Sequence, residues 1–289
     1  MTAPWTSLQQ LVVDDVATWP AKTAACVVLS SRGTLAVAGD LALPLPWASV
    51  TKIVAALAVL EVVFEGSLRL DDPAGPKGST LRHLLGHTSG LACNEHRVVA
   101  APGRRRCYSN VGIDLAVDLA VRRSGSQDAG TLLRERVLNP LGMTSTVLVG
   151  PASHGALGPV SDLALLAREL LVPTVLTDGI VAAATAPSFP GLPGLLPGFG
   201  RQDPNDWGLG VELRGTKSPH WLPRTASPSS AGHFGQAGAL VWADRPHDLA
   251  VACATGTQFG PWAAEAWPRD LGRWLGGWLQ DRPASSPRQ

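Results

Sequence analysis

Two polar side chains, Ser49 and Lys52, stand at the front of a largely apolar run that extends from Trp47 to Phe64. Spaced three residues apart, they would share one face of a helix, with Ser49 in the first turn, where free N–H groups favour a developing anion. A serine hydroxyl becomes a nucleophile when a base takes its proton, and a desolvated lysine can lose its charge. The pair therefore indicates nucleophilic catalysis, although a capping serine beside a solvent-reaching lysine explains the same residues.

A tyrosine motif further along the chain, Tyr108-Ser109-Asn110, offers a second base. A phenol beside a lysine ammonium is stabilised as the phenolate, so Tyr108 could take the proton of Ser49 and return it to the leaving group. Asn110 could either orient the lysine or bind a substrate carbonyl. This motif supplies what the serine and lysine lack when they act alone.

A third motif, His233-Phe234-Gly235-Gln236, stands just ahead of an expected strand that begins at residue 237. It combines a basic residue with a glycine at a strand edge, where the missing side chain lets a substrate lie against the backbone. A backbone N–H beyond the glycine could then form an oxyanion hole together with the N–H of Ser49.

The spacing of apolar residues predicts the elements that carry these motifs. Helices are expected over residues 7–18, 47–64, 113–123, 132–138 and 161–171, with a last one along Trp267, Leu271, Trp274, Leu275 and Trp278. Strands are expected over residues 24–29, 34–38, 207–213, 237–243 and 249–255. Residues 188–206, rich in Pro and Gly, are typical of a long surface loop. Strands at both ends of the chain predict that the two ends meet in one sheet. The catalytic residues would then lie between this sheet and a block of helices.

The bulk composition excludes some classes of partner. The chain has 289 residues, 45% of them hydrophobic and 16% charged, and a formal net charge of +1. A net charge so close to zero indicates neither nucleic acid nor a membrane surface as a partner. The first residues show no basic stretch followed by an apolar one, and no apolar run is long enough to span a bilayer. We therefore expect a soluble, cytoplasmic protein.

Neither a metal site nor a disulfide framework is expected from the cysteines and histidines. The cysteines lack metal-ligand spacing, so we interpret them as small buried hydrophobes in a reducing compartment, with a regulatory Cys93–Cys107 disulfide as a minor alternative. His83 and His87 have the spacing of a zinc pair, but no glutamate lies between them and no third ligand is evident. The sequence indicates no cofactor.

Taken together, the motifs resemble those of the serine β-lactamase and penicillin-binding-protein superfamily. Within it, the resemblance is to the branch of class C β-lactamases, D-alanyl-D-alanine peptidases and related carboxylesterases. Ser49-Val50-Thr51-Lys52 matches the Ser-x-x-Lys motif, Tyr108-Ser109-Asn110 the Tyr-x-Asn motif, and His233-Phe234-Gly235 the position of the Lys-Thr-Gly box. Supporting stretches fall in family order at residues 81–91, 102–103, 140–143, 161–164 and 207–210.

The resemblance implies an α+β fold with an antiparallel sheet flanked by N- and C-terminal helices, plus an all-helical lobe. The α/β lobe would comprise residues 1–45 and 205–282, the mostly helical lobe residues 46–204, and residues 283–289 would form a disordered tail.

The same resemblance implies acyl transfer through a covalent acyl-enzyme. Ser49 would attack, Lys52 and Tyr108 would act as a coupled base, and Asn110 would help to hold the substrate. The backbone N–H groups of Ser49 and Gln236 would stabilise the oxyanion.

Two departures from the family pattern bear on the substrate. His233 replaces the lysine and Phe234 the threonine that in β-lactamases face the antibiotic carboxylate, so strong β-lactamase activity is not expected. We expect an intracellular esterase that acts on small acyl esters. The alternatives are a D-amino-acid peptidase or amidase, a weak β-lactamase, or a catalytically silent scaffold. The Arg104–Arg106 run could meet an anionic substrate or form a solvated loop, and the oligomeric state is left open.

Overall fold

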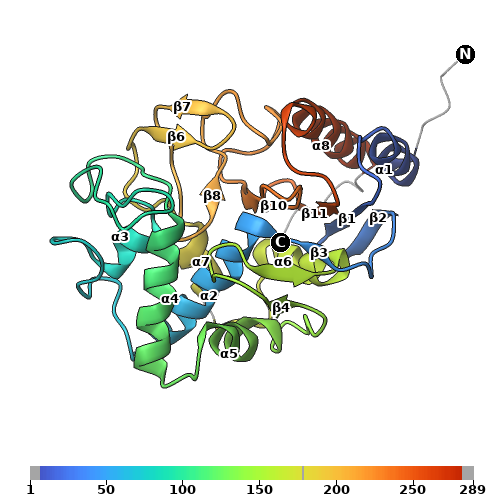
Figure 1. Ribbon diagram of the computed structural model, residues 1–289. Helices are drawn as coiled ribbons and strands as arrows, with labels where there is room; N and C mark the ends of the chain where they lie inside the picture. Colours follow the sequence, from blue (N-terminus) through green and yellow to red (C-terminus); the bar gives the residue numbers. More distant parts are fainter. Residues whose placement is uncertain (1–6, 178, 282–289) are drawn as a thin grey trace, which may run out of the picture.

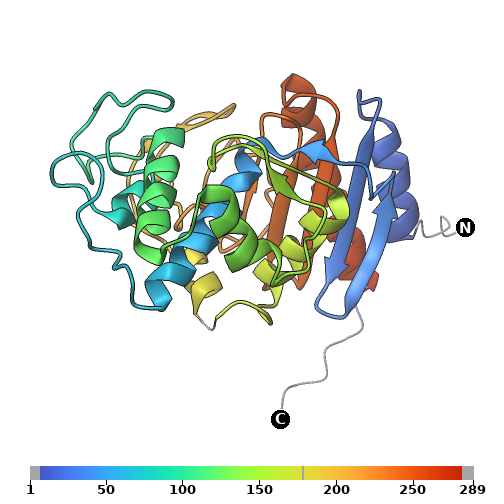
Figure 2. The ribbon, with the colours of Figure 1, turned by 60° about the horizontal axis from the view of Figure 1, so that its bottom comes forward.

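The computed structural model describes residues 7–177 and 179–281. Its largest sheet has six antiparallel strands in the order β2-β1-β11-β10-β9-β8 (Figures 1 and 2). The strands are β1 (Ala24–Ser30), β2 (Gly33–Ala38), β8 (Glu212–Leu213), β9 (Ala231–Phe234), β10 (Leu240–Asp244) and β11 (Leu249–Thr255). The fold is of the predicted α+β class, and the first and last parts of the chain share one sheet.

The outer face of this sheet carries the two terminal helices, α1 (Leu8–Ala17) and α8 (Pro261–Asp281), which lie side by side in Figure 1. Ser7 caps α1 by accepting a hydrogen bond from the Gln10 N–H. The predicted apolar stripe of α8 is buried against this face. Two buried carboxylates link the helices, because Asp15 accepts from the Trp274 indole and Asp270 from the Trp19 indole, each at 2.9 Å.

The inner face packs against α6 (Val160–Leu171) and the main core. At the centre of that core lies α2 (Thr51–Phe64), in which every side chain from Thr51 to Leu60 is buried. This confirms a helix enclosed on all sides, as expected for a run without a polar face. The elements of the surrounding helical layer are α3 (Leu81–Leu85), α4 (Asn110–Ser124), α5 (Ala129–Leu133), the π-helix η2 (Arg134–Leu138) and α7 (Ile180–Thr185).

Three expectations for the later part of the chain are wrong. Residues 188–206 contain a small hairpin of β6 (Gly194–Leu196) and β7 (Gly200–Gln202) instead of only a loop. The strand expected over residues 207–213 is reduced to Glu212–Leu213, and β9 (Ala231–Phe234) lies in a stretch where no strand was expected. The remaining strands are short ones, β3 (Leu45–Pro46), β4 (Val147–Leu148) and β5 (Ala156–Gly158), which form a separate sheet.

The cysteines depart from the expectation of four free thiols. Cys26 and Cys253 face each other across β1 and β11 and form a disulfide, whereas Cys93 and Cys107 are free. The error arose because their pairing depends on the register of two strands that are 227 residues apart in the sequence. Disulfides persist mainly in oxidising compartments. The cysteines therefore no longer support the expectation that the protein resides in a reducing compartment.

Among the described residues, no helix is both long and apolar enough to cross a membrane, and no group of three or more acidic, histidine or cysteine side chains is placed to hold a metal ion. The expected tail over residues 283–289 lies outside the described residues. The division into two lobes stays a prediction.

Candidate active site

Ser49 lies in a single turn of 3-10 helix, η1 (Ala48–Val50), which leads directly into α2. The turn is fixed on both sides. The Trp47 indole donates to the Gly158 carbonyl at 2.9 Å, and a Cβ at Gly235 would collide with the Trp47 carbonyl oxygen. Ala48 has a φ of 45°, a conformation that a non-glycine residue keeps only where its surroundings enforce it. The half-buried Ser49 is therefore presented on a constrained backbone.

Lys52 points from the first turn of α2 back toward Ser49 and is fully buried. Its Nζ donates to Ser49 Oγ at 3.1 Å and to the Ser153 carbonyl at 2.8 Å. Burial lowers the pKa of Lys52 from 10.5 to about 7, because the ammonium loses its hydration. A neutral Lys52 can keep its bond to Ser153 while its lone pair accepts the proton of Ser49.

The Ser153 carbonyl is held in place by Asp114, a residue of α4. The Asp114 carboxylate accepts from the Ser153 N–H at 2.8 Å and from the Ser153 hydroxyl at 2.9 Å. The negative charge of Asp114 also raises the pKa of Lys52, against the larger effect of burial. Neither residue was predicted, because the contact to Lys52 uses a backbone carbonyl that any residue type could supply.

Tyr108 completes the group, with Lys52 Nζ lying 4.8 Å from the centre of its ring. The ring packs against His87 at 4.7 Å and Trp207 at 5.6 Å between centroids. This burial raises the pKa of Tyr108 well above its usual 10, although a hydrogen bond with Ser49 opposes the effect. The structure therefore favours a neutral phenol over the phenolate expected from the sequence.

His233 lies inside strand β9 and is buried, instead of standing ahead of a strand as expected. Its Nδ1 is 2.7 Å from the Phe234 carbonyl oxygen and so carries the proton, which leaves Nε2 as an acceptor for the Tyr108 hydroxyl at 3.4 Å. Burial and the nearby charge of Lys52 lower the pKa of His233 to about 3. The residue is therefore a neutral acceptor and not a cation.

Phe234 points to the opposite face of the sheet, as neighbouring residues of a strand must. Its ring packs against Phe259 at 4.6 Å and Trp267 at 6.1 Å, in the core beneath α8. The phenylalanine is thus accounted for by packing.

Gln236 lines the same cavity as Ser49, and Gly235 lies against Trp47, just before the turn that carries Ser49; the oxyanion role of the Ser49 and Gln236 N–H groups stays a prediction. Within the described residues, neither the Ser49 N–H nor the Gln236 N–H donates to an acceptor of the chain. The Gln236 side chain is turned away and donates to the Phe259 carbonyl at 3.0 Å. Gly235 was expected to leave room for a substrate. In the structure, the space left by its missing side chain is occupied by the Trp47 backbone.

Asn110 begins α4 and faces the same space as Ser49. Its Nδ2 donates to Asn94 at 2.7 Å, whereas its Oδ1 is buried and, within the described residues, has no partner. Because Lys52 is oriented by Ser153, the alternative in which Asn110 orients the lysine is not seen. Asn110 Oδ1 remains an acceptor that a ligand could satisfy.

These side chains surround one cavity of about 280 Å³, which we call the catalytic cavity. Of the residues singled out from the sequence, Ser49, Tyr108, Asn110, His233, Phe234 and Gln236 line it. Lys52 lies behind Ser49, to which it is hydrogen-bonded. Trp207 and Glu212 also line it, and neither was predicted as a site residue. Burial raises the pKa of Glu212, but Lys217 at 3.0 Å and His220 at 2.8 Å together outweigh it and lower the pKa, so the carboxyl is ionised.

This fold, with the serine, lysine and tyrosine motifs on one cavity, defines the class of serine β-lactamase and penicillin-binding-protein-like proteins. The chain belongs to the β-lactamase family, whose model matches residues 43–273. A crystal structure of a β-lactamase from Mycobacterium bovis is 45% identical, covers 92% of this chain and 98% of its own, and gives a TM-score of 0.89.

More distant structures share the fold alone. Simvastatin synthase (LovD) from Aspergillus terreus is 16% identical with a TM-score of 0.73, and covers 94% of this chain and 95% of its own. The octameric penicillin-binding protein homologue from Pyrococcus abyssi is 19% identical with a TM-score of 0.74, and covers 93% of this chain and 77% of its own. The curated relative from Escherichia coli K12, the D-alanyl-D-alanine-carboxypeptidase/endopeptidase AmpH, is 29% identical over 34% of this chain. That match spans about a third (35%) of its own length.

Proposed function

We propose that the protein is a serine hydrolase that acts through an acyl-enzyme on small acyl esters. The observation that carries the proposal is the contact of Ser49 with a fully buried lysine whose pKa is about 7. At neutral pH a large fraction of such a lysine is an amine, which is the form that can accept the serine proton.

In the proposed acylation step, Ser49 Oγ attacks the substrate carbonyl carbon while its proton passes to Lys52 Nζ. The backbone N–H groups of Ser49 and Gln236 stabilise the oxyanion. As the ester C–O bond breaks, the neutral Tyr108 hydroxyl gives its proton to the departing alkoxide, and Lys52 returns a proton to Tyr108. Water then attacks the acyl-enzyme, releases the acid and restores Ser49.

The charges around the catalytic cavity favour a substrate that is uncharged next to its reacting carbonyl. The cavity lining contains no lysine or arginine side chain within the described residues, and it includes the ionised Glu212. His233, at the position of the family's lysine, is neutral. A β-lactam carries its carboxylate close to the reacting amide, and here that charge would meet no lysine or arginine among the described residues that line the cavity. An ester with an uncharged leaving group meets no such penalty.

The test is intact-mass spectrometry of the wild type and of Ser49→Ala after exposure to a fluorophosphonate, alongside turnover of a series of nitrophenyl esters. We expect one adduct on the wild type alone, turnover of short esters, and loss of both in a folded Ser49→Ala protein. A Ser49→Ala protein with near wild-type rates would refute the mechanism. If the wild type gave neither adduct nor turnover, the scaffold alternative would be favoured.

A second candidate activity is hydrolysis of D-amino-acid peptides, which the partial similarity to AmpH favours. The same cavity could acylate Ser49 from an amide, because Tyr108 can protonate a departing amine as well as an alkoxide. Release of D-alanine from a D-alanyl-D-alanine peptide, without turnover of esters, would favour this activity over the first.

A further inference from the structure

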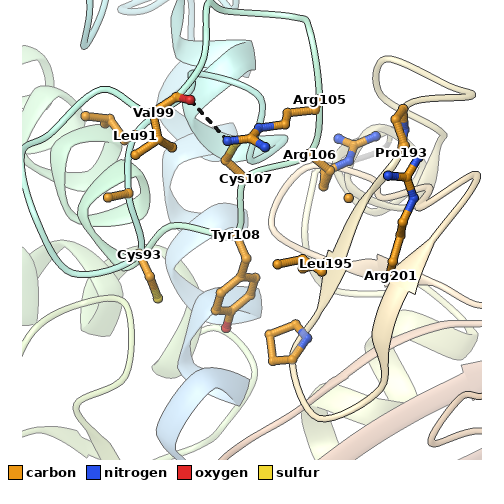
Figure 3. A pocket seen from close by; sticks show the side chains of 13 residues that line it. Leu91, Cys93, Val99, Arg105, Arg106, Cys107, Tyr108, Pro193, Leu195 and Arg201 are labelled. Atoms are coloured by element: carbon orange, nitrogen blue, oxygen red, sulfur yellow. Dashed lines mark hydrogen bonds between the residues drawn. The ribbon is translucent and has the colours of Figure 1, made fainter.

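A second and larger cavity, of about 560 Å³, lies beside the catalytic cavity and is shown in Figure 3. We call it the side pocket. Cys93, Tyr108 and Pro197 line both cavities, so the side pocket reaches the catalytic group directly. Its volume falls within the range of roughly 300–1,000 Å³ that is usual for small-molecule sites. The catalytic mechanism proposed above does not use it.

The walls of the side pocket are built by segments that are distant in the sequence. The Arg106 N–H donates to the Pro193 carbonyl at 2.8 Å, which joins the tyrosine-motif segment to strand β6. The buried Arg106 guanidinium donates to the carbonyls of Ser188 at 2.8 Å and Asn205 at 3.0 Å. Arg106 therefore serves to hold the wall and is not available to a ligand.

The lining is mostly apolar where it meets solvent. Leu195, at the middle of β6, is 67% exposed although it is a large apolar side chain, and in Figure 3 it lies close to the Tyr108 ring. Leu91 and Val99 line the opposite side. An exposed leucine on the wall of a cavity is what a ligand with an apolar body would cover.

The charges of the side pocket have one sign. Arg105 and Arg201 are exposed members of the lining, which includes no aspartate or glutamate within the described residues. Within the described residues, the Arg105 guanidinium donates only to the uncharged Val99 carbonyl, at 3.1 Å. Arg201 forms an ion pair with Asp203 at 3.5 Å, and because both side chains are well exposed this pair is weak. The side pocket thus offers positive charge that the catalytic cavity lacks.

We propose that the side pocket binds the part of the substrate distal to the reacting carbonyl, and that this part is an apolar chain or ring carrying a carboxylate. The apolar body covers Leu195, and the carboxylate faces Arg105 and Arg201. The inference rests on the proposed acyl-enzyme function. It narrows the substrate class to esters or amides with a remote negative charge.

The test compares three nitrophenyl esters: the acetate, the hexanoate, and the half-ester of adipic acid, which has the hexanoate chain length and ends in a carboxylate. We expect the hexanoate to exceed the acetate in kcat/KM by on the order of tenfold, because a buried methylene adds up to about fourfold. The adipate half-ester should at least equal the hexanoate. A hexanoate no better than the acetate would overturn the proposal.

Two variants with matched controls locate the effect. Leu195→Ser should lower the hexanoate-to-acetate ratio severalfold, whereas Leu279→Ser, an exposed leucine of α8, should leave it at the wild-type value. Arg105→Gln with Arg201→Gln should lower the adipate-to-hexanoate ratio by about two- to tenfold, since exposed charge pairs are weak. Arg104→Gln, whose arginine is exposed and outside the lining, should not. Unchanged ratios in both test variants would refute the assignment.

Binding can be tested apart from catalysis. The dye 8-anilinonaphthalene-1-sulfonate has an apolar body and an anionic group, and its fluorescence on the folded Ser49→Ala protein reports occupancy of such a site. We expect saturable binding that Leu195→Ser weakens severalfold and Leu279→Ser does not. Dye binding without ester turnover would reject the hydrolase function and keep the pocket, whereas turnover without chain-length preference or dye binding would reject the pocket alone.

Discussion

The pH dependence of acylation tests the central inference, because it reports which group takes the Ser49 proton. Burial lowers the pKa of Lys52 from 10.5 to about 7, so its amine form is in the minority below that pH and predominates above it. With an uncharged ester as substrate, kcat/KM should rise with pH up to about 7 and then level off. A phenolate mechanism predicts a different profile, since burial raises the pKa of Tyr108 above 10.

The size of the effect follows from the fraction of neutral lysine. With a pKa of about 7, roughly 9% of Lys52 is neutral one pH unit lower and roughly 1% two units lower, so kcat/KM should fall about a hundredfold by about pH 5. His233 cannot produce this limb, because its pKa is about 3. The assay follows nitrophenol at its isosbestic wavelength, and the rate of fluorophosphonate labelling gives a second profile without substrate. A flat profile between about pH 5 and 9, or a midpoint near 10, would refute Lys52 as the base.

Three further predictions follow from the geometry. Asp114→Asn removes a charge that raises the pKa of Lys52, so the ascending limb should move to lower pH; a limb that stays in place or moves upward would contradict the contact. Lys217→Met leaves the buried Glu212 carboxylate without its ammonium partner, so the free energy of unfolding measured in urea should fall by about 3–5 kcal/mol. Arg97→Met in the exposed Arg97–Glu95 pair should change stability little, and equal losses in the two variants would be inconsistent with this reasoning. Gly235→Ala places a Cβ against the Trp47 carbonyl and should displace Ser49, with a fall in kcat of about a hundredfold or more. Gly276→Ala, in α8 with open space around it, is the control, and similar rates in both glycine variants would exclude this role for Gly235.

The elements that sequence reasoning predicted well are those with an unambiguous apolar pattern. The run from Ile53 to Leu60 has no polar face and forms the enclosed centre of α2. Trp267, Trp274 and Trp278 recur at helical spacing along the buried side of α8. In both cases the local pattern and the tertiary environment agree, which is why period alone is sufficient.

The missed elements are short, and their residue types carry little pattern. Strand β9 reads Ala-Gly-His-Phe, is buried throughout and has no alternation, so only its neighbours β8 and β10 define it. The β6–β7 hairpin has three residues in each strand within a Pro- and Gly-rich stretch. Short strands of this kind are specified by their pairing and burial in the folded chain more than by a local sequence pattern.

The same distinction applies to the candidate site. Ser49, Lys52 and Tyr108 are predictable because their side-chain types carry the chemistry and stand in recognisable motifs. Ser153 contacts Lys52 through its backbone carbonyl and lies 101 positions away in the sequence, so no residue pattern could predict the contact. The neutral states of Tyr108 and His233 depend on burial by Trp207 and its neighbours, which exists only once the chain has folded.

The position of β1 between β2 and β11 also sets an order of events during synthesis. At roughly 5–20 residues per second, a ribosome would need about 10 to 45 s to add the 227 residues that separate Cys26 from Cys253. Through that interval the first hairpin has no partner on its β1 side, and the nascent chain exposes an open strand edge. The turn that carries Ser49 likewise lacks the β9 segment against which it rests. Activity should therefore emerge only after the last strands are made, and premature termination upstream of β11 should yield aggregation-prone, inactive chains.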